Sequence, residues 1–302
     1  MHNKNTCIEP LSPGAILRFL LVVFALGIIL QVAAIRAGLR GSGSGLLLLT
    51  MWAPTVAAIT TSRAARRMAW VALKRLNICW LGLGLLIGWA PGLLKALFLA
   101  LSRMGSWDSG HFELAPDGGS ILAVHHIGVA LGTGPQSFVH FAINLLFSIT
   151  LGSVVIALIG GVGEEIGWRV VLQPSLERRF GRFRGTCLVG LIWAYWHLPV
   201  NLVGYNDVHS PLLNALLFFP LGVVAMSFGL AWLTRQSKSV WPAALAHGAN
   251  NTIGAAFLVV AKGSSENIVA ELLSLFLVGG VFIWRSLRHD AANRTDHCEN
   301  KG

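Results

Sequence analysis

Residues 138–159 read FVHFAINLLFSITLGSVVIALI, and residues 160–169 continue GGVGEEIGWR. The first stretch contains no Asp, Glu, Lys or Arg and is long enough to cross a bilayer as a helix, which needs about 20 apolar residues. Two adjacent glutamates and an arginine follow at once. An ionisable side chain at membrane depth is costly, and it persists mainly where it is paired, hydrated or functional. The segment therefore predicts a membrane fold and a functional site together.

Composition places the rest of the chain in the same class. Of 302 residues, 54% are hydrophobic and 12% are charged, and the mean hydropathy is +0.66, whereas soluble domains contain about 25% charged residues. We predict an all-α polytopic membrane protein with about eight transmembrane helices, at residues 19–35, 46–61, 78–101, 138–159, 188–203, 212–233, 240–261 and 268–284.

Two apolar stretches have other readings. The first predicted span, residues 19–35, is longer than the apolar core of a signal peptide, which favours an uncleaved helix. Residues 121–131 are short and interrupted by His125 and His126, so we interpret them as an interfacial or re-entrant segment. No internal repeat stands out, and residues 1–302 are interpreted as a single integral membrane domain.

Lysine and arginine are distributed unevenly between the two sides of this arrangement. The amino terminus, residues 62–77, 160–187 and 234–239, and the carboxyl tail share one side and carry 17 basic residues, whereas the opposite loops carry 4. Because cytoplasmic loops are enriched in Lys and Arg, both termini are expected in the cytoplasm, as is the mouth of any cavity beside Glu164. The net charge of +10 then reflects topology and affinity for the lipid bilayer, and no nucleic acid partner is implied.

The four cysteines have no C-x-x-C spacing and lie on or near the predicted cytoplasmic side, at Cys7, Cys79, Cys187 and Cys298. This distribution argues against disulfides and against a thiolate zinc site.

The two glutamates are expected to have different roles. Glu165 and Arg169 are four residues apart and share a helix face, while Glu164 points about 100° away. This spacing predicts a structural ion pair and one free carboxylate. The alternative is that both glutamates lie in a hydrated cytoplasmic loop near the arginines of residues 178–184.

A second motif, WAYWHLP at residues 193–199, lies in the fifth apolar stretch. Pro199 removes a backbone donor and can kink the helix beside His197, and a buried histidine needs a hydrogen-bond partner. Taken alone, His197 has the simpler reading of a packing residue whose hydrogen bonds are satisfied. Trp193, one turn earlier, is interpreted as a supporting residue in the wall of a site.

A third motif, AHGANN at residues 246–251, lies in the seventh stretch. His247 and Asn251 are four residues apart, so both project from one face, whereas Asn250 points to a different face. Taken alone, the pair is equally well read as polar contacts between helices.

The three motifs together contain the parts of a hydrolase. A carboxylate with a nearby histidine can deprotonate water, while a second histidine and an asparagine can donate hydrogen bonds to the oxyanion that forms when water attacks an amide. Hydrolysis of a peptide bond within the membrane is the reaction that these groups favour.

The same motifs resemble those of the CAAX prenyl protease and bacteriocin-processing (CPBP, or Abi) intramembrane proteases. The resemblance covers about residues 138–262 and rests on Glu164-Glu165-x-x-x-Arg169, an aromatic-x-x-x-His motif ending at His197, and His247-x-x-x-Asn251. Ile166-Gly167-Trp168-Arg169 and Leu172-x-Pro174 are also typical of bacterial members. Trp193 stands where phenylalanine is commoner, which affects the shape of the cavity and hence substrate preference.

This resemblance implies an eight-helix fold around a cavity open to the cytoplasm and the membrane. It further implies that Glu164 and His197 activate water, that His247 and Asn251 form the oxyanion site, and that Glu165 and Arg169 brace the helix. The expected substrate is a membrane-anchored peptide or protein, and the expected location is a bacterial inner membrane. A prenylated peptide, a bacteriocin leader and a membrane-anchored regulator are not distinguished by the sequence.

Two alternatives stay open. Glu164, His197 and His247 could hold zinc in a metalloprotease, although no His-Glu-x-x-His is present and no cofactor is favoured. The chain could also be a non-catalytic bacteriocin-immunity or scaffold protein of the membrane. A transporter is disfavoured because paired half-helices and repeat symmetry are missing.

Overall fold

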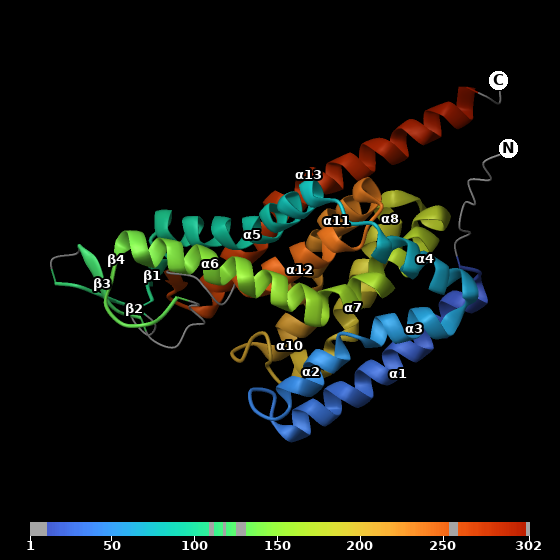
Figure 1. Ribbon diagram of the computed structural model, residues 1–302. Coiled ribbons are helices and arrows are strands. Elements are labelled where there is room, and N and C mark those ends of the chain that lie inside the picture. The colour runs from blue at the N-terminus through green and yellow to red at the C-terminus, as the bar shows by residue number, and fades with distance from the viewer. Residues whose placement is uncertain (1–10, 109–111, 117–118, 125–130, 254–258, 300–302) are drawn as a thin grey trace.

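The computed structural model describes residues 11–108, 112–116, 119–124, 131–253 and 259–299. The first half of the chain contains α1 (Pro13–Ala37), α2 (Ser44–Thr50), α3 (Ala53–Thr61), α4 (Arg63–Lys74), α5 (Ile78–Leu101), β1 (Gly105–Trp107), β2 (Phe112–Leu114), β3 (Ser120–Val124) and β4 (Gln136–Ser137). Helices make up most of the molecule, and the strands lie at the end of it farthest from the two chain termini (Figure 1).

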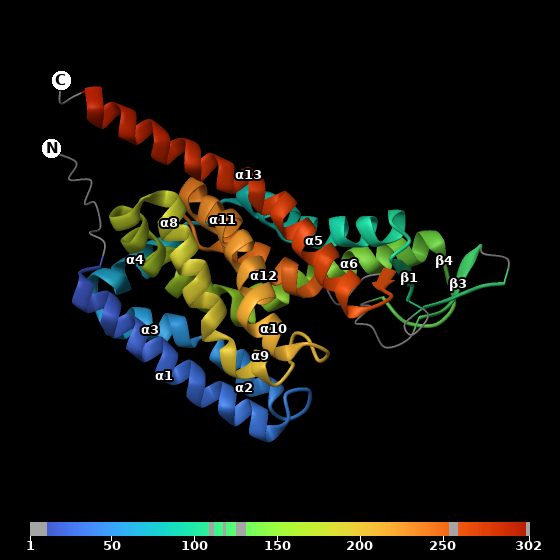
Figure 2. The same ribbon diagram turned by 180° about the vertical axis from the view of Figure 1, so that it is seen from behind.

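The second half is built around the polar motifs. It contains α6 (Phe138–Ile156), η1 (Ala157–Gly161), α7 (Val162–Glu165), η2 (Ile166–Leu172), α8 (Gln173–Trp196), α9 (Leu198–Leu202), α10 (Pro211–Leu213), η3 (Asn214–Phe218), α11 (Phe219–Ser237), α12 (Trp241–Ile253), β5 (Val259–Ala261) and α13 (Ser264–Glu299). Seen from behind, α1 lies along one side of the bundle and α13 along another, with α8, α11 and α12 between them (Figure 2).

Among the described residues, six helical segments are long and apolar enough to cross a membrane, namely Pro13–Ala37, Ser44–Thr61, Ile78–Leu101, Phe138–Trp196, Pro211–Ser237 and Ser264–Ala292. Large apolar side chains are exposed along these helices, as lipid contact requires; on α1, for example, Leu21 is 62% exposed and Ile29 is 64% exposed. The predicted all-α polytopic membrane class is therefore confirmed.

The number of segments differs from the eight expected for two reasons. The segment Phe138–Trp196 is 59 residues long and contains the predicted span 138–159 and most of the predicted span 188–203. Helix α12, in the predicted span 240–261, has 13 residues in the described part of the chain, which stops at residue 253 and resumes at residue 259.

Two predicted apolar segments form strands in part. Residues 259–261, predicted as the end of a span, form β5, which pairs antiparallel with β1. Residues 121–124, predicted as re-entrant or interfacial, belong to β3, which pairs with β2 and β4; residues 125–130 lie outside the described part of the chain. The helical prediction for residues 259–261 was wrong because a short apolar run cannot be assigned to a helix or a strand by periodicity alone, and the interfacial or re-entrant placement of residues 121–131 stays a prediction.

The helix that carries the glutamates is widened on both sides of them. The π-helical turns η1 and η2 flank α7, and such turns are often found at functional sites. Glycines allow close approach here, because an added Cβ at Gly161 would lie 2.8 Å from the carbonyl oxygen of Ala244 on α12, and one at Gly167 would lie 2.4 Å from Pro54 on α3. The glutamates are thus held between α3 and α12.

Helix α12 lies at the centre of the bundle. It packs against α5, α6, α7, α11 and η1. Its buried residues Ala243, Ala244, Ala246 and Ala249 are small, and small residues let neighbouring helices approach closely in a membrane protein. This packing places His247 opposite α7.

Candidate active site

Glu164 and Glu165 lie side by side in α7 but are inaccessible to bulk solvent. Glu164 is 2% exposed and Glu165 is 0% exposed. The alternative in which both glutamates lie in a hydrated loop therefore does not hold for this structure. Because a buried carboxylate is stable only with donors or cations beside it, the partners of each side chain indicate its role.

Glu165 binds two groups on different helices. Its Oε2 accepts a hydrogen bond from Nε of Arg169 at 3.0 Å, which is the ion pair that the four-residue spacing predicts. Its Oε1 lies 3.0 Å from Nδ1 of His247, which is 82 residues further along the chain. Glu165 therefore joins η2 and α12 and fixes the orientation of the His247 imidazole.

Arg169 extends this network to α11 and α8. Its Nη2 donates a hydrogen bond to Oγ of Ser227 at 3.3 Å, and its guanidinium carbon lies 4.7 Å from the centre of the Trp193 ring. Its Nη1 has no hydrogen-bond partner among the described residues. A guanidinium buried in this way depends strongly on its carboxylate partner.

Glu164 has a separate set of partners. Its Oε2 accepts hydrogen bonds from the indole Nε1 of Trp193 at 2.5 Å and of Trp168 at 3.3 Å. Trp193 was interpreted as part of the wall, and the structure adds that it is a donor to the carboxylate. Both donors bind the same oxygen, so Oε1 is left for another group.

His197 lies at the end of α8, where the helix is interrupted before Pro199. Its Nδ1 lies 2.9 Å from the carbonyl oxygen of Trp193. Because a carbonyl oxygen can only accept, Nδ1 carries the proton and Nε2 is left with a lone pair. The ring packs edge-on against Trp196 and Phe219, which holds it in place.

His247 and Asn251 lie one turn apart on α12. His247 is 4% exposed, and its ring packs against Trp193 with 5.2 Å between ring centres. Trp193 also lies 6.1 Å from the His197 ring, so one indole separates and supports both imidazoles. Asn250 was expected on a different face, but both Asn250 and Asn251 line the cavity described next.

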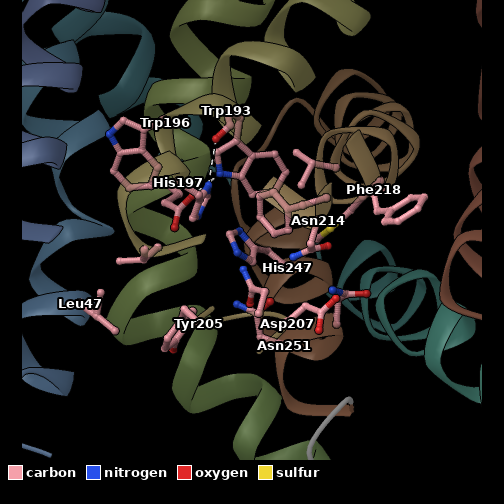
Figure 3. Close-up of a pocket in the computed structure, with 18 of the residues that line it drawn as sticks. Leu47, Trp193, Trp196, His197, Tyr205, Asp207, Asn214, Phe218, His247 and Asn251 are labelled. Carbon is pink, nitrogen blue, oxygen red and sulfur yellow. Dashed lines mark hydrogen bonds between the residues drawn. The ribbon is translucent and has the colours of Figure 1, made fainter. Parts of the chain in front are cut away.

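The four side chains predicted to be catalytic, Glu164, His197, His247 and Asn251, all line one cavity of about 660 Å³. Figure 3 shows the two histidines, Trp193 and Asn251 around this space. The bracing residues Glu165 and Arg169 are not among its lining residues. The structure thus separates the two adjacent glutamates into one that faces the cavity and one that lies behind it.

Zinc was considered as an alternative, with Glu164, His197 and His247 as its ligands. Among the residues that the structure describes, no group of three His, Cys, Asp or Glu side chains is arranged to hold a metal ion. We therefore derive no chemical step through a metal from this geometry.

Three contacts were not anticipated from the sequence. Trp168 donates to Glu164 from four residues away, and this spacing is visible in the sequence. Ser227 binds Arg169, and Gln31 on α1 donates from Nε2 to the carbonyl oxygen of Trp196 at 2.8 Å. The last two join distant segments, and the sequence carries no signal for them.

Fold and site together define a polytopic α-helical membrane protein with a buried glutamate, two histidines and an asparagine around one cavity. Residues 145–253 match the family described as type II CAAX prenyl endopeptidase Rce1-like. A curated relative, CAAX prenyl protease 2 of Methanococcus maripaludis, is 28% identical over 131 residues. Over this segment the chain is similar to the CPBP/CAAX protease family.

The similarity is confined to part of each protein. The aligned region covers 42% of this chain and 46% of the relative, so the chain spans about half the length of the curated relative that it matches. The family match lies inside the motif-bearing segment expected at residues 138–262, and the first third of the chain lies outside that match.

Proposed function

We propose that the protein is an intramembrane endopeptidase that hydrolyses a peptide bond of a membrane-anchored peptide or protein. The observation that carries the proposal is the gathering of Glu164, His197, His247 and Asn251 on one cavity, with Glu165 and Arg169 behind it. Similarity to the type II CAAX prenyl endopeptidase family over residues 145–253 supports the reaction class.

Glu164 and His197 are proposed to activate water. Glu164 is held by two indole donors on Oε2, which leaves Oε1 to accept a proton from water. His197 presents Nε2 as a second acceptor because its Nδ1 proton is bound to a carbonyl oxygen. The water oxygen bonds to the amide carbon as its proton passes to the carboxylate. That proton then passes to the leaving nitrogen as the C–N bond breaks.

His247 and Asn251 are proposed to stabilise the oxyanion. Since Nδ1 of His247 is bound to Glu165, the donor to the oxyanion is Nε2–H, which requires the imidazole to carry both protons. The side-chain amide of Asn251 supplies a second N–H from the same wall of the cavity.

The mechanism is proposed to be metal-free, with two alternatives. A zinc-dependent protease using Glu164, His197 and His247 is distinguished by the metal content of the purified protein. A non-catalytic immunity or scaffold protein is distinguished by the absence of turnover. Location in a bacterial inner membrane with cytoplasmic termini is proposed from the charge distribution, 17 basic residues on one side against 4 on the other.

The experiment that tests the proposal is capture of a substrate, followed by cleavage. Glu164→Gln keeps the shape of the side chain and removes the base, so it should retain membrane peptides that the wild type cleaves. Captured peptides are returned to wild-type protein in proteoliposomes, and products are read by mass spectrometry. Glu266→Gln, which removes a carboxylate outside the cavity lining, is the matched control. No cleavage of any captured peptide by the wild type would contradict the proposal.

A further inference from the structure

The basic segments of the chain meet at one end of the molecule. Asp290 on α13 accepts hydrogen bonds from the backbone N–H groups of Arg182 and Phe183 on α8, each at 2.9 Å. Arg235 on α11 pairs with Glu177 on α8. The chain termini, α4 and the bend of α8 lie at this end in Figure 1. We refer to residues 62–77, 174–187, 234–239 and 285–292 as the basic face.

Further contacts join the segments at this end of the molecule. Trp241 at the start of α12 donates from Nε1 to the carbonyl oxygen of Leu73 at 2.8 Å. Leu11 donates from its backbone N–H to Oγ of Ser175 at 2.9 Å. The basic face is therefore a packed layer in which α4, α8, α11, α12 and the start of α1 are joined.

The cavity is closed toward the basic face. Glu164 and His247 are buried lining residues, and Trp193 and Trp196 are 3% and 1% exposed. The hydrophobic core that includes Leu172, at 0% exposure, continues behind them. We refer to Glu164, Trp193, Trp196 and His247 as the inner end of the cavity.

Several exposed lining residues lie away from Trp193 and Trp196, as Tyr205 and Asn251 do in Figure 3. Ser44, Tyr205, Asn206 and Asn251 are exposed and line the cavity, and we refer to these four residues as the mouth. Three of them come from segments 36–45 and 204–211, which carry only two basic residues between them. Among the described residues, no Lys or Arg lines the cavity.

The distance along α11 from the cavity lining to the basic face is close to the thickness of a membrane. Helix α11 begins at Phe219, which lines the cavity, and ends at Ser237 on the basic face. At about 1.5 Å per residue its length is roughly 28 Å, close to the ~30 Å hydrocarbon core. The mouth and the basic face therefore lie toward opposite membrane surfaces.

We propose that the cavity opens to the extracytoplasmic side and takes a membrane-anchored peptide whose cleavable segment lies at that surface. The orientation follows from the enrichment of Lys and Arg in cytoplasmic segments. It reverses the expectation, drawn from the charge count and the family resemblance, that the mouth faces the cytoplasm. Cleavage of a peptide in this cavity rests on the proposed peptidase function, whereas the side of the membrane to which the cavity opens does not.

Thiol accessibility tests the proposal. In a variant whose four native cysteines are replaced by serine, single cysteines are introduced by Ser44→Cys or Asn206→Cys at the mouth and by Gln236→Cys on the basic face. Gln236 is exposed and uncharged, so its replacement leaves the charge distribution unchanged. A membrane-impermeant maleimide is added to right-side-out and to inside-out vesicles, and labelling in detergent establishes that each cysteine is reactive.

We expect the Ser44→Cys and Asn206→Cys variants to be labelled fully in right-side-out vesicles only. The Gln236→Cys variant should be labelled in inside-out vesicles only. The proposal would be overturned by the reverse pattern or by labelling of all three cysteines from one side. It would also be overturned if the cysteines at the mouth reacted in detergent but in neither kind of vesicle. Labelling needs no turnover, so Glu164→Gln in the same background should give the same pattern. A result that contradicts the peptidase function can thereby be distinguished from one that contradicts the proposed orientation of the cavity.

Discussion

Oε1 of Glu165 lies 3.0 Å from Nδ1 of His247, and Oε2 of the same carboxylate lies 3.0 Å from Nε of Arg169. One buried carboxylate thus sets the orientation of an imidazole on α12 and compensates a guanidinium on η2. It leaves Nε2 of His247 available to the cavity. In the proposed mechanism Glu165 is a positioning residue, whereas Glu164 lines the cavity.

Glu165→Ala should lower stability as well as turnover. The change leaves the Arg169 guanidinium buried without its carboxylate, and breaking a buried ion pair costs about 3–5 kcal/mol. A thermal melt in detergent measures the loss, with Glu266→Ala as the control for a carboxylate outside the network. Adding Arg169→Met to Glu165→Ala should recover much of the melting temperature but not the activity. A Glu165→Ala protein that is inactive yet as stable as the wild type would reverse the roles given to the two glutamates.

Asn251→Ala should lower kcat by about 10²- to 10³-fold with little change in KM, the scale for one lost oxyanion donor. Asn250→Ala is a closely matched control, because both side chains line the cavity and are chemically identical. It should have a much smaller effect. Equal losses from the two variants, measured by steady-state kinetics, would show that the oxyanion role is not specific to Asn251.

Trp193→Phe keeps a ring beside Arg169 and His247 but removes the indole donor to Glu164. Because Trp168 also donates to that oxygen, the single variant should lose about tenfold in turnover, the lower end for a hydrogen bond to a charged group. The double variant Trp168→Phe/Trp193→Phe should lose more than the product of the two single losses. If the loss in kcat of the double variant equals the product of the two single losses, the two indoles do not jointly support the Glu164 carboxylate.

Chelators should leave turnover of the purified protein unchanged if the mechanism is metal-free. The alternative predicts about one zinc per chain and loss of activity on chelation that added metal restores. Elemental analysis of wild type and His247→Ala decides between them. Stoichiometric metal lost together with activity in His247→Ala would contradict the metal-free mechanism and leave the peptidase assignment in place.

What could be predicted from the sequence was mostly local. The Glu165–Arg169 pair follows from a four-residue spacing on a helix, and the apolar stretches follow from length and composition. The contact of Glu165 with His247 joins residues 82 positions apart. No periodicity links such residues, so the motif was found but its second partner was not.

The side that we propose for the cavity differs from the one expected from the sequence, because the charge distribution locates the basic segments but not the open end of the cavity. The position of Glu164 near a basic segment suggested that its mouth lay on the same side. In the structure Trp193 and Trp196, which line the cavity, are buried in the hydrophobic core, whereas the exposed lining residues Tyr205 and Asn206 belong to a segment without Lys or Arg. Which end of a buried site is open depends on long-range packing, which one sequence does not display.

The most direct test of the central claim is the turnover of Glu164→Gln on a peptide that the wild type cleaves. Loss of the general base should lower kcat by at least about 10²-fold, while the melting temperature should stay close to that of the wild type because Glu165 and Arg169 keep their contacts. His197→Ala should lower turnover on the same scale. Wild-type turnover by a folded Glu164→Gln protein would contradict the account.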